Sequence, residues 1–226
     1  MLILGMETSL PEGFVFLAEG GKITNYHKIP PRSSSGYLVP AVKWMLEEKN
    51  ISINEIKAVV VTTGPGSFTG VRIGVSFAKS LSFCLNIGLI GIPTLDCISF
   101  SANCSGIICS LIEGYGGCYF AAFFEKEKKL RKIGNYLFLP VKQIMSMAKK
   151  FSPQRVTFIL SNRTSFPVIN QNDEFYLYKD AIDLDRGMLK IALKRIKNGS
   201  LDNPLTLKPV YVSPPRIKRS TRWKIQ

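Results

Sequence analysis

The sequence predicts an α/β fold that is built twice, with a second copy that is shorter and more divergent than the first. One observation is the order of its segments: strands with a hairpin, then helix, strand, helix and strand, an order that returns in reduced form after residue 105. Another is composition, because 46% hydrophobic and 20% charged residues are typical of a folded globular chain. We expect a first domain at residues 1–95, a second at 96–202 and a basic, proline-containing tail at 203–226.

The first copy opens with three short strands. Residues 2–6, 14–18 and 23–29 are apolar or alternating segments, and the two glycines within residues 19–22 are typical of a hairpin turn. A helix follows, with Pro40 expected in its first turn, where proline is tolerated. The apolar residues of this helix recur at helical spacing, at Leu38, Ala41, Val42, Met45 and Leu46.

Two parallel strands and a long helix complete the first copy. Residues 57–63 and 89–92 have the short apolar runs of buried strands, and residues 69–85 between them predict a helix that Asn86 ends. Residues 52–55 have the spacing of a capping box and predict one short helical turn. The first sheet should therefore join an antiparallel start to parallel crossovers.

The second copy repeats this order. Strands are expected at residues 107–113, 119–124, 133–139 and 156–160, and amphipathic or helical segments at residues 140–150 and 183–197. The tail after Asn203 has no acidic residue, is interrupted by four prolines and is expected to be extended. Its basic residues are Lys208, Arg216, Lys218, Arg219, Arg222 and Lys224.

The charge of the chain is confined to its second half. Residues 1–113 hold eight basic and eight acidic groups, so the whole formal charge of +14 belongs to residues 114–226. A basic half suggests a polyanionic partner, with tRNA as one candidate. A general bias of the proteome toward lysine is the alternative explanation.

The sequence argues against a metal site, a set of catalytic residues and a membrane or secreted location. The five cysteines include no C-x-x-C pair and His27 is the only histidine, so reduced core thiols are expected and a metal site is not. The sequence offers neither a Ser-His-Asp set nor a His-x-x-x-His pair, and we expect no catalytic residue. No apolar run is long enough for a membrane span and the N-terminus does not resemble a signal peptide, which predicts a cytoplasmic protein.

Two turns could contact a phosphate. One follows the first strand, where an acid precedes two hydroxyl residues, and the other is the glycine-rich segment Thr63–Gly70 between a buried strand and a helix. The segment is not a Walker A loop, since no Gly-Lys-Ser/Thr follows. An ordinary turn and a tight strand-to-helix connection are the structural alternatives. The candidate phosphate or nucleotide contacts are Thr8, Ser9, Gly64, Gly66 and Ser67.

The two helices of the first copy have more apolar surface than one core needs. From Val71 to Leu85 only Arg72 and Lys79 are charged, and the first helix has a second apolar face beside its core stripe. Such surplus predicts a protein–protein interface, with deeper internal burial as the alternative. The candidate contacts are Tyr37, Ala41, Trp44, Phe68, Ile73, Phe77, Lys79 and Leu81.

Three segments resemble the TsaB (YeaZ) family: Leu4–Ser9, Gly64–Gly74 and Pro209–Pro215. The resemblance implies a duplicated actin/hexokinase-like (ASKHA, ribonuclease H-like) fold and a role in making threonylcarbamoyladenosine at position 37 of ANN-decoding tRNAs. It implies a non-catalytic relative of TsaD that binds a TsaD-like catalytic subunit through the two helices, with a TsaE-like ATPase and tRNA joining the complex. A homodimer through the same helices is also implied. No cofactor is expected on this chain alone, while ATP or ADP would enter with the complex.

The sequence departs from the family pattern in two places. Ser34-Ser35-Gly36 stands where related proteins have a histidine motif, so metal binding is not expected. Residues 112–116 stand where an Asp-Ala-Arg-like segment is usual, which puts the role of that arginine in doubt. The alternative function is an enzyme acting alone, either an ATP-dependent small-molecule kinase or a glycoprotease-type metallopeptidase.

Overall fold

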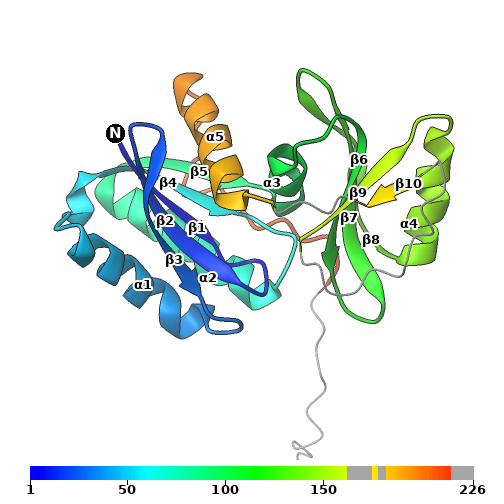
Figure 1. Ribbon diagram of the computed structural model, residues 1–226. Helices are drawn as coiled ribbons and strands as arrows, with labels where there is room; N and C mark the ends of the chain where they lie inside the picture. The colour runs from blue at the N-terminus through cyan, green and yellow to red at the C-terminus, as the bar shows by residue number, and fades with distance from the viewer. Residues whose placement is uncertain (162–174, 178–181, 215–226) are drawn as a thin grey trace, which may run out of the picture.

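The computed structural model describes residues 1–161, 175–177 and 182–214 and shows two five-stranded sheets side by side (Figure 1). The strand orders are β3-β2-β1-β4-β5 and β10-β9-β6-β7-β8. In each sheet three antiparallel strands are followed by two that pair in parallel, so the second sheet repeats the topology of the first. The predicted duplicated α/β fold is thereby confirmed.

The five strands of the first sheet and three of the helices come from residues 1–101. Their bounds are β1 Leu2–Glu7, β2 Gly13–Glu19, β3 Lys22–Ile29, α1 Ser34–Glu48, the 3₁₀ turn η1 Ile53–Glu55, β4 Ile56–Thr62, α2 Phe68–Leu85, β5 Gly88–Ile92 and α3 Thr94–Ser101. The predicted capping box is present at η1, where Ser52 and Glu55 exchange side-chain and backbone hydrogen bonds. Asn86 ends α2 in the left-handed conformation, with φ of 51°.

The second half of the chain contains the second five-stranded sheet. Its elements are β6 Gly106–Glu113, β7 Cys118–Lys126, β8 Leu130–Pro140, α4 Val141–Ala148, the 3₁₀ turn η2 Lys149–Phe151, β9 Val156–Leu160, β10 Phe175–Leu177 and α5 Leu184–Lys197. Strand β10 has three residues and is the shortest described strand in either sheet.

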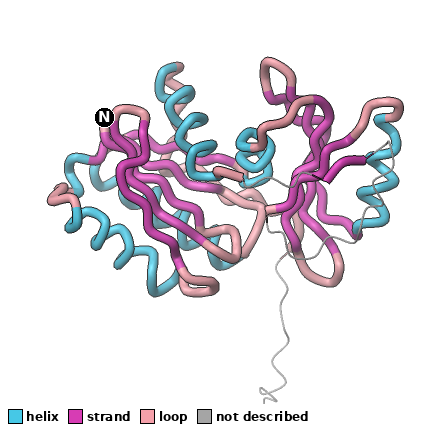
Figure 2. The backbone as a smooth tube through the Cα atoms, viewed as in Figure 1, coloured by secondary structure: helices cyan, strands magenta, loops and turns pink. Residues whose placement is uncertain are grey.

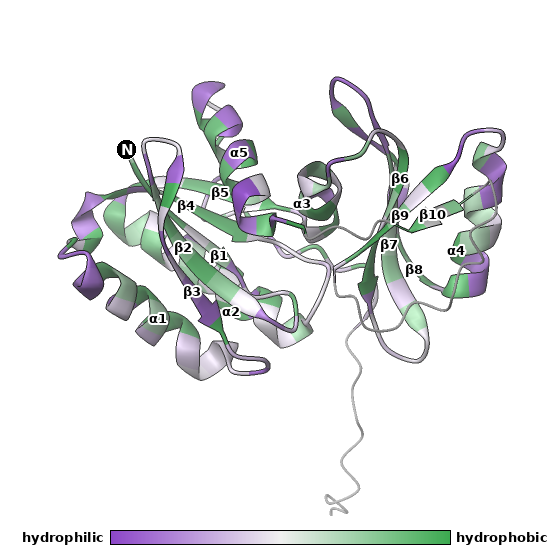
Figure 3. Ribbon diagram, viewed as in Figure 1, coloured by the Kyte–Doolittle hydropathy of each residue, from purple (hydrophilic) through white to green (hydrophobic). Residues whose placement is uncertain are grey.

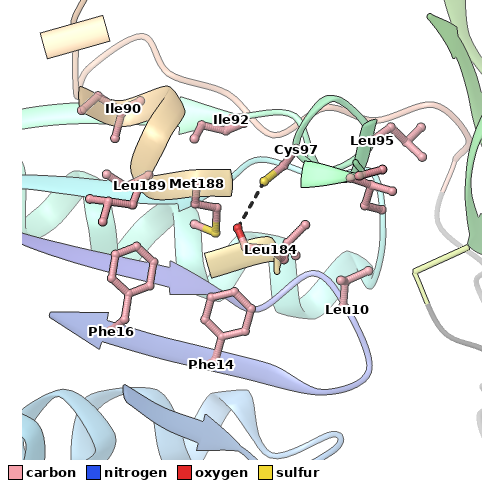
Figure 4. Packing of buried hydrophobic residues seen from close by; sticks show 14 of the residues in the cluster. Leu10, Phe14, Phe16, Ile90, Ile92, Leu95, Cys97, Leu184, Met188 and Leu189 are labelled. Atoms are coloured by element: carbon pink, nitrogen blue, oxygen red, sulfur yellow. Dashed lines mark hydrogen bonds between the residues drawn. The ribbon is translucent and has the colours of Figure 1, made fainter. Parts of the chain in front are cut away.

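Helices cover both faces of the first sheet (Figure 2). Helices α1 and α2 pack on one face through a core that includes Leu38, Met45 and Val75, all nearly inaccessible to solvent. Helix α5 covers the other face, where Phe14, Phe16, Ile90, Cys97 and Met188 meet (Figure 4). Helix α3 packs between α5 and strands β6, β7 and β8 of the second sheet. Because that second core also contains residues of β6 and β7, it continues between the two sheets. Helix α5 therefore packs on the first sheet, although its residues lie in the predicted second domain, 96–202.

Two details differ from the sequence prediction. Helix α3 was not expected, although residues 94–101 form two turns of it directly after Pro93. Pro40 lies in the second turn of α1, not the first, because the helix begins at Ser34. The Ser33 carbonyl starts the earlier turn by accepting hydrogen bonds from the backbone of Gly36 and Tyr37, at 3.0 and 2.9 Å.

The described end of the chain, residues 199–214, returns across the first domain and is called the C-terminal segment below. Asp202 holds it to the outer edge of β5, since its carboxylate accepts from Gly91 N at 2.7 Å and its own N–H donates to Leu89 O at 2.8 Å. Arg195 pairs with the same carboxylate at 3.1 Å and also donates to Gly91 O at 2.9 Å. The segment therefore covers the backbone groups that an edge strand leaves open. Tail residues 215–226, with Arg216, Lys218, Arg219, Arg222 and Lys224, lie outside the described residues.

Candidate functional site

A cleft of about 740 Å³ lies where the two sheets and the C-terminal segment meet. Its walls come from the turn after β1, the glycine-rich segment that leads into α2, the turn between β6 and β7, and residues 210–214. Both predicted phosphate turns therefore reach one cleft, although more than fifty residues separate them in the sequence. Among the described residues that line it, Arg32 is the only basic one.

The turn after β1 is organised by Glu7, which is fully buried. Its Oε1 accepts hydrogen bonds from the backbone N–H groups of Ser9 and Leu10, the latter at 2.9 Å. Its Oε2 and the hydroxyl of Thr62 are buried near one another, and neither has a further hydrogen-bond partner among the described residues. Burial raises the pKa of Glu7, and hydrogen bonding only partly offsets this. The acid fixes the shape of the turn from inside and offers no surface to a ligand.

Three glycines allow the start of α2 to lie against this turn. A Cβ atom at Gly66 would stand 2.3 Å from Ser9 O, one at Gly70 would stand 1.9 Å from Thr8 O, and one at Gly74 would stand 2.2 Å from Thr8 Oγ1. No side chain fits at such distances, and two of the three opposing atoms are backbone. Gly70 and Gly74 lie four residues apart in α2 and so share one face of the helix, toward the turn after β1, while Gly66 lies just before the helix. Their physical role is close packing of α2 on the turn.

The hydroxyls of the turn are used within the protein. Thr8 Oγ1 donates to Gly70 O at 2.7 Å, and Ser9 Oγ shares a hydrogen bond with Thr94 Oγ1 at 2.9 Å. Both residues are only 1% exposed. A phosphate could reach them only if the turn opened, so the closed turn does not fit a phosphate grip.

The remaining phosphate candidates are also engaged. Ser67 is the N-cap of α2: its side chain accepts from Gly70 N at 3.2 Å and its N–H donates to Ser9 O at 2.7 Å. Gly64 has φ of +88° and its carbonyl accepts from Thr94 N at 2.8 Å. The glycine-rich segment is thus a tight strand-to-helix connection, the structural alternative considered above.

The opposite wall of the cleft is aromatic. Tyr115, in the turn between β6 and β7, packs on Phe138 with ring centroids 4.8 Å apart. Its hydroxyl donates to Pro214 O at 3.2 Å. Tyr211 lies 5.3 Å from Phe68 between ring centroids and accepts a hydrogen bond from Arg72 Nε at 2.9 Å. The C-terminal segment therefore joins the start of α2 to the second sheet along the rim of the cleft.

Of the three residues of α1 predicted to contact a partner, two are exposed and one is buried. Tyr37 and Trp44 are exposed and form an edge-to-face pair with ring centroids 5.4 Å apart. Both lie on the side of α1 that also carries Glu48, whose carboxylate bonds Asn25 and His27 of β3. Ala41 is a correction to the prediction, because it is fully buried in the first core and offers no surface to a partner.

On α2 the predicted contacts divide into two groups. Ile73, Phe77 and Leu81 recur at four-residue spacing as a half-buried stripe packed against the first core. Phe68 and Lys79 lie under the C-terminal segment, where Lys79 Nζ donates to Leu207 O at 2.9 Å. These two side chains are occupied within the chain and contribute less free surface than expected.

Two exposed apolar residues of the same helices were not predicted. Val39 on α1 is 58% exposed and Phe83 on α2 is 64% exposed. Neither residue belongs to the regular apolar stripes from which the interface was predicted. Only their solvent exposure in the structure identifies them as surface residues. Solvent exposure of large apolar groups on two neighbouring helices is typical of a surface that a partner covers.

The described part of the chain contains neither a grouped set of metal ligands nor a membrane-spanning helix. Among the described residues, no three His, Cys, Asp or Glu side chains are grouped closely enough to hold a metal ion. None of the helices in the described part of the chain is long and apolar enough to cross a membrane.

Comparison with known sequences gives a consistent family match. A model of the family described as TsaD, tRNA N6-adenosine threonylcarbamoyltransferase, matches residues 28–188. A Bacillus subtilis protein named tRNA threonylcarbamoyladenosine biosynthesis protein TsaB is 29% identical over 132 residues, which are 58% of this chain and 58% of that protein. A Haemophilus influenzae protein of the same name is 23% identical over 236 residues, covering 99% and 96% of the two chains. The match thus spans little more than half of the first relative and almost all of the second.

Solved structures agree on the fold. YeaZ from Pseudomonas aeruginosa superposes with a TM-score of 0.73 at 18% identity, covering 93% of this chain and all of that one. An activator of 2-hydroxyisocaproyl-CoA dehydratase from Clostridium difficile, solved with bound ADPNP, gives a TM-score of 0.50 at 12% identity over 93% of this chain and all of that one. At these identities the likeness shows the fold, and the expected actin/hexokinase-like architecture is confirmed.

Proposed function

Because the chain belongs to the TsaD family and, within it, to the TsaB (YeaZ) group, we propose that it is an accessory subunit in the synthesis of threonylcarbamoyladenosine at position 37 of ANN-decoding tRNAs. In this role it stabilises and activates a TsaD-like catalytic partner and does not turn over substrate alone. A TsaE-like ATPase and tRNA complete the assembly, which works in the cytoplasm.

One observation supports this function above others: uncovered apolar side chains gather on α1 and α2. Trp44 is 42% exposed and, with Tyr37, forms a rigid aromatic pair. Aromatic residues of this kind are enriched where interfaces bind most strongly. The half-buried stripe of Ile73 and Phe77 would add apolar area if a partner helix packed beside it. The same surface could pair two copies of this chain when the partner is absent.

The cleft supports an accessory role over independent catalysis. Thr8 and Ser9 are buried and hydrogen-bonded to Gly70 and Thr94, so the turn that would hold a phosphate is closed. We propose that the isolated chain binds no nucleotide tightly and that ATP or ADP enters with the partners. A kinase or metallopeptidase acting alone gains no support from this arrangement.

Copurification with the TsaD-type protein of the same organism tests the proposed interface. We expect Trp44→Glu and Phe83→Glu each to lower recovery of the partner at least tenfold, because each places a carboxylate in an apolar contact. Leu205→Glu is the matched control: Leu205 is 72% exposed and lies outside both helices.

Thermal unfolding of all three variants should match the wild type, since the changed side chains are at the surface. Full recovery of the partner by both helix variants would contradict the interface, and failure of the wild-type chain to bind would contradict the function.

A further inference from the structure

A stripe of cations runs along the solvent-facing side of α5. Arg186, Lys190, Lys194 and Lys197 are all exposed. At 100° per residue they fall within an arc of roughly 80°. The last three span seven residues, or roughly 10 Å along the helix axis. Arg186 is paired with Asp183 at 3.3 Å, whereas the three lysines form no ion pair with any described residue.

A second group of lysines lies across α3 from this stripe, in the hairpin between β7 and β8. Lys128 and Lys129 are exposed there. At its base Lys126 Nζ donates to the carbonyls of Ser99, Phe100 and Ala102, at 3.0, 2.8 and 2.6 Å, which anchors the hairpin to the end of α3. Helix α5 packs on α3 from the other side. In Figure 3 the hairpin and α5 rise on the same side of the molecule, both with strongly hydrophilic residues.

Lys190 of α5 lies close enough to Lys126, at the base of the hairpin, for its charge to affect the pKa of Lys126. Burial lowers the pKa of Lys126, and the positive charge of Lys190 lowers it further. Few acids compensate: Glu125 is paired with Arg131, and Glu127 is the one carboxylate left in the hairpin. Like charges held together without partners are an electrostatic cost, which a bound polyanion would remove.

We propose that Lys190, Lys194 and Lys197 of α5, together with Lys128 and Lys129 of the hairpin, bind the phosphate backbone of RNA. The five residues are called the α5–hairpin surface. The choice of RNA rests on the proposed function, which makes tRNA the polyanion that the assembly must hold. Backbone contacts of this kind position a substrate without reading its sequence.

An anionic membrane fits the surface less well. A helix that binds in a membrane interface needs an apolar face free to enter the lipid. The apolar face of α5, with Leu184, Met188 and Leu189, is already buried against the first sheet (Figure 4). Only the cations remain available, so a binding mode through phosphate contacts alone is favoured.

Binding of the full-length chain to fluorescently labelled tRNA tests the surface. The variant Lys190→Gln/Lys194→Gln/Lys197→Gln removes three charges and keeps residues that favour a helix. Between ~50 and ~200 mM salt, we expect the slope of log K against log salt to become shallower by about 2–3. At ~50 mM salt, the affinity should fall at least tenfold.

The matched control, Lys43→Gln/Lys49→Gln/Lys57→Gln, removes three exposed charges from the first domain and should change the affinity less than twofold. Equal loss in the two triple variants would overturn the proposal, as would no measurable RNA binding by the wild type. If RNA binding were lost only when the chain ended at Pro214, and not in either triple variant, the binding would be assigned to residues 215–226 instead. Stronger binding to phosphatidylserine vesicles than to RNA would overturn it in favour of a membrane.

Partner recovery separates this test from that of the proposed function. The α5 triple variant should still copurify with the TsaD-type protein, since α5 lies on the opposite face of the first sheet from α1 and α2. If the wild-type chain bound RNA but no partner, the proposed function would be contradicted, whereas the proposed RNA-binding role of the α5–hairpin surface would be supported.

Discussion

At the scale of single residues, the contact between Gly70 and Thr8 determines how α2 meets the first sheet. The space at Gly70 is closed by a backbone carbonyl, which cannot rotate away as a side chain could. A methyl group there must displace either the helix or the turn, and both are held by the hydrogen bond from Thr8 Oγ1 to Gly70 O. The glycine is required for packing, independently of any ligand.

Replacement of Gly70 by alanine should therefore destabilise the protein by roughly 3 kcal/mol or more, as overpacking against rigid backbone does. Gly36→Ala on α1 is the control, because a Cβ atom at Gly36 would meet nothing within 4 Å. That change should stabilise the protein by about 0.5–1 kcal/mol through helix propensity. Urea unfolding measures both, and equal effects at the two positions would contradict the packing role.

Glu7 predicts a pH dependence of stability. Its pKa is raised in the folded state, so the folded protein favours the protonated acid. The contribution of Glu7 to stability is therefore greatest below the unfolded-state pKa, and it is lost as the pH rises from there through the folded-state pKa. Glu7→Gln removes this cost, keeps an acceptor for the Ser9 and Leu10 N–H groups and should stabilise the protein on the order of 1 kcal/mol at neutral pH.

Unfolding free energies of wild type and Glu7→Gln should therefore converge at acid pH and diverge as the pH rises. Glu19→Gln, at an exposed strand end, is the control and should show no such divergence. A constant difference at all pH values would mean that the pKa of Glu7 is the same in the folded and unfolded states.

At the scale of elements, the C-terminal segment completes the first sheet. The carboxylate of Asp202 replaces the strand that β5 lacks on its outer side. Asp202→Ala should leave Gly91 N–H without its acceptor and Arg195 without its partner, at a cost of about 1–3 kcal/mol. Asp202→Asn keeps an acceptor and should cost less. Thermal unfolding distinguishes the two, and equal losses would assign the effect to the ion pair alone.

Most elements were predictable because their signal is local. The stripe from Leu38 to Leu46 matches the buried side of α1 residue for residue, and Asn86 ends α2 as expected. Helix α3 was not predictable, since eight residues with β-branched and serine side chains carry neither a clear period nor a polar cap. The contacts of the C-terminal segment were equally hidden, because Asp202 binds a strand more than a hundred residues away.

The candidate site was less predictable than the fold. The sequence singled out the turn at Thr8 and Ser9 and the glycine-rich segment as two separate candidates. It could not show that they meet at one cleft or that the hydroxyls are already bonded, because Thr8 and Gly70 are 62 residues apart. It also counted Ala41 both in the core stripe and in the partner surface, since an alanine at the border of two helical stripes fits either side. Distant pairings and the borders of stripes are decided by tertiary packing.

At the scale of the whole molecule, the C-terminal segment connects the two halves. It bonds β5 through Asp202, the end of β4 through a hydrogen bond from Val210 N to Thr63 O at 2.7 Å, and the second sheet through Tyr115 and Pro214. A chain ending at Asn198 should lose these bonds and melt at least several degrees lower than one ending at Pro214. Both truncations lack residues 215–226, so the difference isolates residues 199–214. Equal melting temperatures would mean that the segment contributes no stability.

The proposed function requires that the chain activate a catalytic partner and have no turnover of its own. Its most direct test is the rate of threonylcarbamoyl transfer to tRNA by the TsaD-type protein and its ATPase, measured with this chain, without it, and with this chain alone. We predict at least tenfold faster transfer when the chain is present, loss of that gain with Trp44→Glu, and no transfer by the chain alone. Equal rates with and without the chain, or turnover by the isolated chain, would contradict the account.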